Sequence, residues 1–120
     1  MKDSFYSEEE LKEFKVILIK KKEIAEKQIE DYSVMIEEIA YNGRDEVGLG
    51  NSNQDIQLEE LIEYKKRAVK HLKDIDNALL RIKNKVYGVC SITGKKIKKE
   101  RLKAVPTTTK SIEGKTRIQN

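Results

Sequence analysis

Two apolar repeats of equal length constrain this chain more than any other feature of its sequence. Positions spaced alternately by three and four residues from 11 to 39 are apolar at seven of nine places, and a second series from 58 to 86 is apolar at eight of nine. This spacing lines side chains along one side of a helix, as in a coiled-coil seam. Each repeat therefore predicts a long helix whose apolar stripe must be covered by another helix.

The segment between the repeats predicts a turn. Over residues 42–53 the periodicity stops, and three glycines stand among Asn and Ser residues, which favour irregular backbone. If the chain reverses direction at this turn, the two seams face each other, with Leu11 beside Val86 and Ile39 beside Leu58. The simplest arrangement is an antiparallel helical hairpin.

Short-range signals place the ends of this hairpin. Ser7 followed by Glu10 has the spacing of a capping box, so the first helix is expected to begin near residue 8. After Val86 the periodicity gives way to a segment with several glycines, one proline and a run of three threonines. We expect this segment to pack against the base of the hairpin through its apolar side chains. These are Tyr87, Ile92, Ile97, Leu102 and Val105.

The fold class predicted is therefore all-α, in three parts. Residues 1–86 form the helical hairpin, with an acidic tip loop at 42–55. Residues 87–112 form a small globular segment, and residues 113–120 a polar tail, frayed or briefly helical. No internal repeat is evident.

Composition sets the expected location and class. The chain has 120 residues, enough for one small domain. Its single cysteine, Cys90, has no partner for an intrachain disulfide, and the longest apolar run, residues 16–19, is far below the roughly 20 residues that span a bilayer. We expect a cytoplasmic protein without membrane contact. One Cys and one His, His71, without cooperative spacing give no sign of an enzyme.

The net charge of +4 conceals a separation of charge along the chain. Residues 1–60 carry 8 basic and 16 acidic side chains, whereas residues 61–120 carry 17 basic and 5 acidic ones. Acids concentrate around the predicted tip, where Asp45, Glu46 and Asp55 are candidate functional residues. Bases concentrate in one short stretch of the second half. They are Lys95, Lys96, Lys98, Lys99, Arg101 and Lys103.

The segment after the second repeat carries a motif of nine residues within twenty positions. These residues are Tyr87, Gly88, Cys90, Gly94, Ile97, Arg101, Leu102, Ala104 and Pro106. In type and spacing they resemble the carboxy-terminal signature of the DksA/TraR family of bacterial transcription factors. The resemblance covers about residues 55–112, and extends to the first helix through the shared hairpin architecture.

The resemblance also shows what this chain lacks. Zinc-binding members of the family hold the metal with four cysteines, and the corresponding positions here are Cys90, Thr93, Ser111 and Gly114. Structural zinc needs four N or S donors, so we expect no zinc. Apolar contacts and hydrogen bonds, with Thr93 and Ser111 as partners, are expected to replace it.

The family resemblance implies a function. Its members insert their hairpin into the secondary channel of RNA polymerase, with an acidic tip near the catalytic magnesium and a basic globular end, here Lys95, Lys96, Lys98, Lys99 and Arg101, at the rim. The DxxDxA tip motif of well-studied members is replaced here by Val47, Gly50 and Ser52. We expect an acidic tip with a different arrangement, a monomer, and no sequence-specific DNA binding. A response to ppGpp is left open, with Arg67 and Lys115 as candidate contributors.

Two alternatives remain open from sequence. The basic stretch allows nonspecific nucleic-acid binding, although it has no interleaved aromatic residues. The apolar seams allow a coiled-coil adaptor that dimerises instead of pairing its own two helices.

Overall fold

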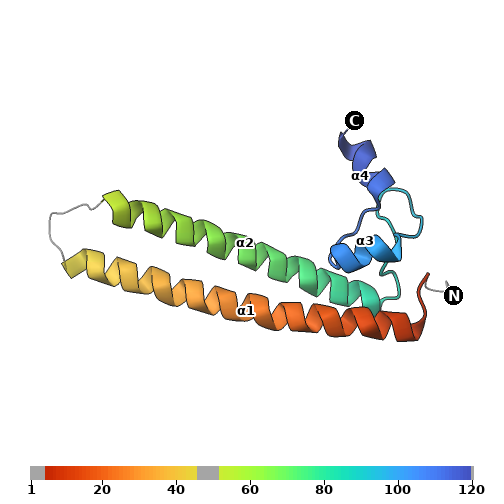
Figure 1. Cartoon of the computed structure of the whole chain (residues 1–120), viewed down its shortest axis with the longest axis horizontal. Coiled ribbons are helices and arrows are strands. Elements are labelled where there is room, and N and C mark those ends of the chain that lie inside the picture. The colour runs from red at the N-terminus through yellow and green to blue at the C-terminus, as the bar shows by residue number, and fades with distance from the viewer. Residues whose placement is uncertain (1–4, 46–51, 120) are drawn as a thin grey trace. The chain divides into compact units, whose positions relative to one another are not determined.

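The computed structural model describes residues 5–45 and 52–119, and four helices account for most of this part of the chain (Figure 1). They are α1 (Glu8–Asp45), α2 (Ser52–Lys83), α3 (Lys99–Ala104) and α4 (Ile112–Gln119). Apart from one isolated antiparallel bridge between Val89 and Lys96, the described ranges contain no β-structure. The all-α prediction is confirmed. None of these helices is long and apolar enough to cross a membrane.

The start of α1 is fixed by the predicted capping box. The Ser7 backbone N–H donates to Glu10 Oε1 at 3.1 Å, and the Glu10 N–H donates to Ser7 Oγ at 3.2 Å. Two of the otherwise unpaired N–H groups at the helix start are thereby satisfied. The predicted helix start near residue 8 is confirmed.

Two compact units divide the chain, and both long helices contribute to each. The proximal unit comprises Met1–Lys22 with Asp74–Asn120, and the distal unit comprises Glu23–Lys73. The proximal unit contains most of the fully buried apolar side chains among the described residues. These are Tyr6, Leu11, Phe14, Leu18, Ile75, Ala78, Tyr87, Cys90, Ile97 and Leu102.

The distal unit is covered much less completely. Only Ala25 and Ala68 are fully buried among its described apolar side chains. Met35 was predicted as a seam residue but is 45% exposed. A stripe shared by two helices alone leaves its edges open to water, because no third helix or strand occurs among the described residues of this unit.

The end of α2 differs from the predicted seam. Lys85 adopts a left-handed conformation, with φ of 61°, and the Val86 N–H donates to Arg81 O while the Lys85 N–H donates to Ile82 O. This pair of bonds is the Schellman motif that ends a helix. Val86 therefore lies beyond α2 and is exposed, so its predicted place in the helical seam was wrong.

Both long helices extend into the segment predicted as a loop. Helix α1 continues to Asp45 and α2 begins at Ser52, so the predicted loop limits were too wide. Each added helical residue gains a backbone hydrogen bond, and a glycine costs only about 1 kcal/mol in a helix. The tail is helical, because α4 spans Ile112–Gln119.

Candidate functional site

Cys90 lies at the centre of a hydrogen-bond network that closes the finger-like segment, residues 87–116. Its side chain is 1% exposed. The Thr93 and Ser111 backbone N–H groups each donate to Cys90 Sγ at 3.3 Å, and Ser111 Oγ donates to it at 3.4 Å. The Gly114 N–H in turn donates to Ser111 Oγ at 3.0 Å. The structure therefore brings all four predicted zinc-equivalent positions together.

Gly114 is needed in this network because it has no side chain. A Cβ atom built on it would lie 2.7 Å from Cys90 Sγ and 3.2 Å from Ile92 Cβ. Such distances are too short for a methyl group without movement of the neighbours. The glycine thus allows α4 to approach the sulfur closely.

The network changes the acidity of the cysteine. Burial alone would raise the pKa of the Cys90 thiol, but the hydrogen bonds from Ser111 and Thr93 outweigh burial and lower the pKa to about 6. Three donors point at a sulfur atom that, as a thiolate, is only an acceptor. The Cys90 thiol is consequently expected to be mostly deprotonated at neutral pH.

The donor set does not fit a structural zinc ion. Cys90 supplies one sulfur, the Thr93 hydroxyl accepts from the Lys95 N–H at 3.2 Å, the Ser111 hydroxyl is already bonded to Cys90, and Gly114 has no donor. Structural zinc sites use four Cys or His ligands. In the part of the chain that the structure describes, no three Cys, His, Asp or Glu side chains form a group able to hold a metal.

Other signature residues form the core beneath this network. The Tyr87 hydroxyl donates to Pro106 O at 2.7 Å, and burial of this side chain raises the pKa of Tyr87. Gly88 has a φ of 83°, and a Cβ there would lie 2.5 Å from the Tyr6 ring. Ile97 and Leu102 are completely buried. These residues hold the shape of the segment rather than a ligand.

Arginines connect the backbone of the same segment. Arg101 Nε donates to Lys110 O at 2.7 Å, and an Arg81 guanidinium nitrogen donates to the carbonyls of Val86 and Val89. Gly94, with φ of 69°, supports the turn in which its N–H donates to Cys90 O at 2.9 Å.

Three of the predicted apolar residues in this segment are exposed to solvent. Ala104 is exposed at the end of α3. Two predicted apolar contacts, Ile92 and Val105, are wrong, since both side chains are exposed.

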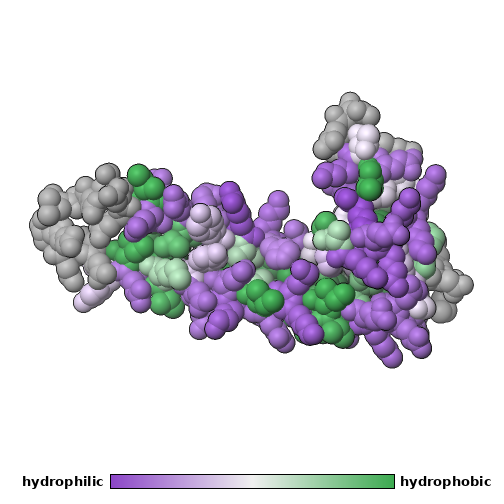
Figure 2. Space-filling view, viewed as in Figure 1, coloured by the Kyte–Doolittle hydropathy of each residue, from purple (hydrophilic) through white to green (hydrophobic). Residues whose placement is uncertain are grey.

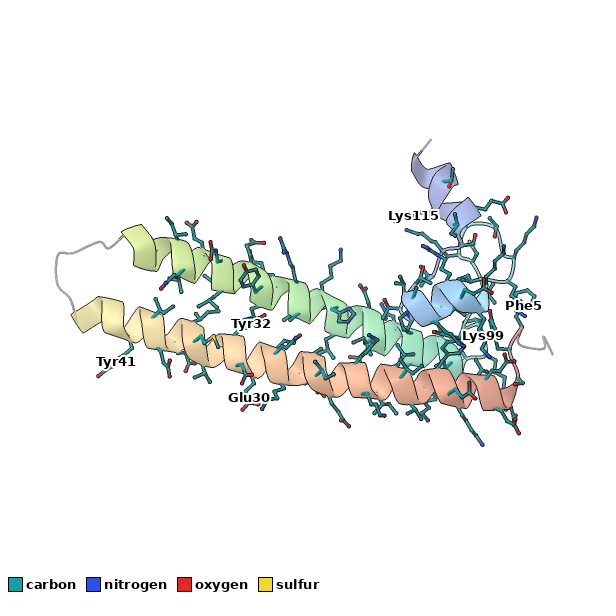
Figure 3. All side chains as sticks on the ribbon, in the orientation of Figure 1. Phe5, Glu30, Tyr32, Tyr41, Lys99 and Lys115 are labelled. Carbon is teal, nitrogen blue, oxygen red and sulfur yellow. The ribbon has the colours of Figure 1, made fainter. Side chains whose placement is uncertain are left out.

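The predicted basic residues surround a groove of about 610 Å³ on the proximal unit. Lys95, Lys96, Lys98 and Arg101 line it, together with Glu100, Ala104, Ser111, Ile112 and Glu113. Lys99 lies outside this lining and forms an ion pair with Glu10 at 3.3 Å. Figure 3 labels Lys99 near Phe5 at the base of the hairpin. Four of the five predicted rim residues therefore line the groove, and the fifth, Lys99, forms an ion pair within the proximal unit.

The structure describes only part of the predicted tip. Asp55 is exposed in the first turn of α2, Asp45 is the last residue of α1, and Glu46 lies outside the described residues, as do Val47 and Gly50. The acidic character extends well beyond the tip, however. The described side chains over 30–41 and 55–63 include eight acids and no base.

The amino-terminal segment contributes a contact that sequence analysis did not predict. The Tyr6 hydroxyl donates to Ile97 O, its ring packs edge-on against Phe14 with centroids 5.9 Å apart, and Lys96 Nζ lies 4.6 Å from the ring centroid. Glu10 has its pKa lowered by the Ser7 backbone and by Lys99. Only the capping box hinted that this end of the chain is ordered.

Comparison with known proteins gives similar relatives along almost the whole chain. RNA polymerase-binding transcription factor DksA of Caulobacter vibrioides is 30% identical over 115 residues, covering 96% of this chain and 80% of that protein. The uncharacterized protein YteA of Bacillus subtilis is 51% identical over 39 residues, which are 32% of this chain but only 16% of that protein. No family model matches the sequence.

Solved structures agree with this result. Transcription factor DksA2 from Pseudomonas aeruginosa superposes with a TM-score of 0.83 at 25% identity, covering 96% of this chain and 87% of the other. The RNA polymerase binding protein and transcriptional regulator Dks from Chlamydia trachomatis has a TM-score of 0.51 at 21% identity, covering 95% and 92% of the two chains. The second likeness concerns the fold alone.

Proposed function

The chain belongs to the DksA/TraR family of bacterial transcription factors, and from that premise we propose that it regulates transcription by binding RNA polymerase. The hairpin enters the secondary channel of the enzyme, and the protein makes no sequence-specific contact with DNA. It acts in the cytoplasm as a monomer, by binding rather than by catalysis.

The observation that carries this proposal is the segregation of charge on a family fold. The described side chains over 30–41 and 55–63 include eight acids and no base, and one of these acids, Glu63, pairs with Lys66 just beyond this range. The basic groove belongs to the proximal unit. Acidic surfaces are attracted into positively charged channels and suit basic groups or magnesium there. The basic groove suits acidic groups at the outer rim.

Retention on purified bacterial RNA polymerase tests the proposal. The wild-type chain is expected to bind and to alter initiation in a purified transcription assay. Neutralising the predicted tip with Asp45→Asn and Glu46→Gln is expected to remove the transcriptional effect while the basic groove retains binding. The matched control, Glu23→Gln with Glu26→Gln, neutralises two exposed acids elsewhere on α1. If the wild-type chain does not bind polymerase, the proposal fails.

The two alternatives predict different results in simple assays. Tight, sequence-dependent retardation of DNA without polymerase would favour a nucleic-acid-binding protein. A stable dimer in sedimentation would favour the adaptor. We expect weak, salt-sensitive DNA retardation and a monomer.

We also propose that this function needs no zinc. Its support is the Cys90 network, in which hydrogen bonds occupy the sulfur and both hydroxyls that a metal would require. Whether ppGpp modifies the activity is a separate question, for which Arg67 and Lys115 are candidate positions. Arg67 is exposed on α2, and Lys115 is exposed on α4, as Figure 3 shows.

Metal analysis of the purified protein tests the zinc proposal. We expect no stoichiometric zinc and no change in melting temperature with a chelator. The triple variant Thr93→Cys, Ser111→Cys, Gly114→Cys is expected to acquire one zinc per chain, because the four positions already converge. One zinc per wild-type chain, or unfolding of the wild type by the chelator, would overturn it.

A further inference from the structure

The distal unit contains an apolar groove between α1 and α2 that no part of the described chain covers. Its volume is about 300 Å³. The groove is lined by Met35, Glu38, Ile39, Gln57, Glu60, Leu61 and Tyr64. All of these residues belong to the distal unit, and we refer to this feature as the distal groove.

Two of the apolar side chains that line the distal groove are exposed to solvent over much of their surface. Met35 and Tyr64 are each 45% exposed. Tyr64 is held in place by Tyr32, with ring centroids 6.0 Å apart, and Figure 3 shows Tyr32 on α1 beside α2. In Figure 2, hydrophobic side chains form a patch over the left-hand parts of both helices. A continuous exposed apolar surface of this kind is typical of an interaction site.

The rim of the distal groove is acidic. Glu38 and Glu60 belong to its lining. Lys66 pairs with Glu63 at 3.8 Å, and six acids outside the lining lie on the same two helices of the distal unit. These are Glu30, Asp31, Glu37, Asp55, Glu59 and Glu63. An apolar floor with an acidic rim is complementary to an apolar side chain flanked by basic ones.

We infer that the distal groove is the docking site for a segment of RNA polymerase that presents one bulky apolar side chain between basic residues. The inference rests on the proposed function, and it names a contact by which the hairpin binds RNA polymerase. Nucleic acid is disfavoured as an occupant because its phosphates would meet the acidic rim. The apolar floor contributes affinity, and the rim contributes association rate and orientation.

The basic stretch of a second copy, residues 95–103, does not offer the required segment. It contains Ile97 and Leu102 as its only bulky apolar residues, and both are completely buried. Elsewhere in the chain, Ile112 is 66% exposed and stands between Lys110 and Lys115 in the sequence. The cross-linking test below therefore has to distinguish polymerase from a second copy.

The test compares the same substitution, apolar residue to lysine, at two exposed positions of α1. Met35→Lys places a cation in the distal groove, and Ile24→Lys places one at another exposed position of α1 in the same unit, where the native side chain is 59% exposed. We expect Met35→Lys to weaken polymerase binding about tenfold or more, and Ile24→Lys less than about twofold. Circular dichroism checks that both variants fold.

A second measurement does not depend on the folding of Met35→Lys. A photoreactive benzoylphenylalanine at position 35 is expected to cross-link to polymerase, and the same group at position 24 is not. If the wild type binds but the two variants bind equally and position 35 gives no cross-link, the groove inference fails while the proposed function stands. Cross-linking of position 35 to a second copy of this chain would also overturn it. If the wild type does not bind, both fail.

Discussion

Gly114 lies close to Cys90 in the finger-like segment, and a single added methyl group tests this close approach. Gly114→Ala would place a Cβ 2.7 Å from Cys90 Sγ, a sulfur held by three hydrogen bonds. Although alanine favours a helix by about 1 kcal/mol, overpacking of a core costs about 1–3 kcal/mol. We expect a net loss of about 1 kcal/mol in urea unfolding. Lys115→Ala, at an exposed neighbour, is expected to change stability by less than about 0.5 kcal/mol, and equal stability of the two variants would contradict the contact.

The thiol of Cys90 gives stability a dependence on pH. The folded state lowers the pKa of Cys90 from 9.0 to about 6, so it binds this proton less tightly than the unfolded chain does. The stabilisation is complete above the ordinary thiol pKa and is lost as the pH falls toward 6. We expect thiolate absorbance of the folded protein to titrate with a midpoint near 6.

The matched variant for this titration is Cys90→Ser, whose hydroxyl does not ionise in this range. Its free energy of unfolding is expected to vary less between about pH 9 and pH 6 than that of the wild type. A wild-type absorbance midpoint at the ordinary thiol value would show that the three donors do not stabilise the thiolate.

Residue spacing predicted the convergence of the zinc-equivalent positions but not the way in which they interact. The signature placed Cys90, Thr93, Ser111 and Gly114 by register alone. Thr93 was expected as a hydrogen-bond partner, and the structure shows which of its groups takes part: its backbone N–H reaches the sulfur, while its hydroxyl accepts from the Lys95 N–H. Such choices depend on local backbone geometry, which sequence spacing does not specify.

Among the elements, the proximal and distal parts of the α1 seam contribute unequally to stability. Leu18 is completely buried in the proximal unit, whereas Met35, on the same predicted stripe of α1, is largely exposed in the distal unit. We expect Leu18→Ala to cost about 2–5 kcal/mol, the usual range for a buried leucine. Met35→Ala is expected to cost less than about 1 kcal/mol, because little area returns to water. Urea unfolding followed by circular dichroism measures both, and equal losses would mean that the distal seam is buried in solution.

The elements also show where pattern analysis succeeded and where it failed. Period and capping signals located α1 and α2, since an apolar stripe and a reciprocal cap are local properties. They misplaced Val86, whose position depends on the left-handed Lys85, and the loop limits, which depend on how far helices propagate. Tyr6 escaped notice because its partners, Ile97 and Phe14, are set by tertiary packing.

For the whole molecule, segregated charge matters more than the net charge of +4. If acids of the distal unit are attracted to a basic region of polymerase, affinity must fall as salt screens them, since the screening length is about 8 Å at physiological ionic strength. We expect Glu37→Gln, Glu59→Gln and Glu63→Gln together to lower affinity at low salt and to flatten its salt dependence, mainly through a slower association rate.

The control for this prediction removes the same charge from other exposed positions of α1. Glu8→Gln, Glu9→Gln and Glu13→Gln, all in the proximal unit, change the net charge equally. If net charge governed binding, the two triple variants would show the same salt slope in a titration of polymerase affinity. If position governs it, only the distal variant loses slope, because attraction over such short screening lengths acts between facing groups rather than between total charges.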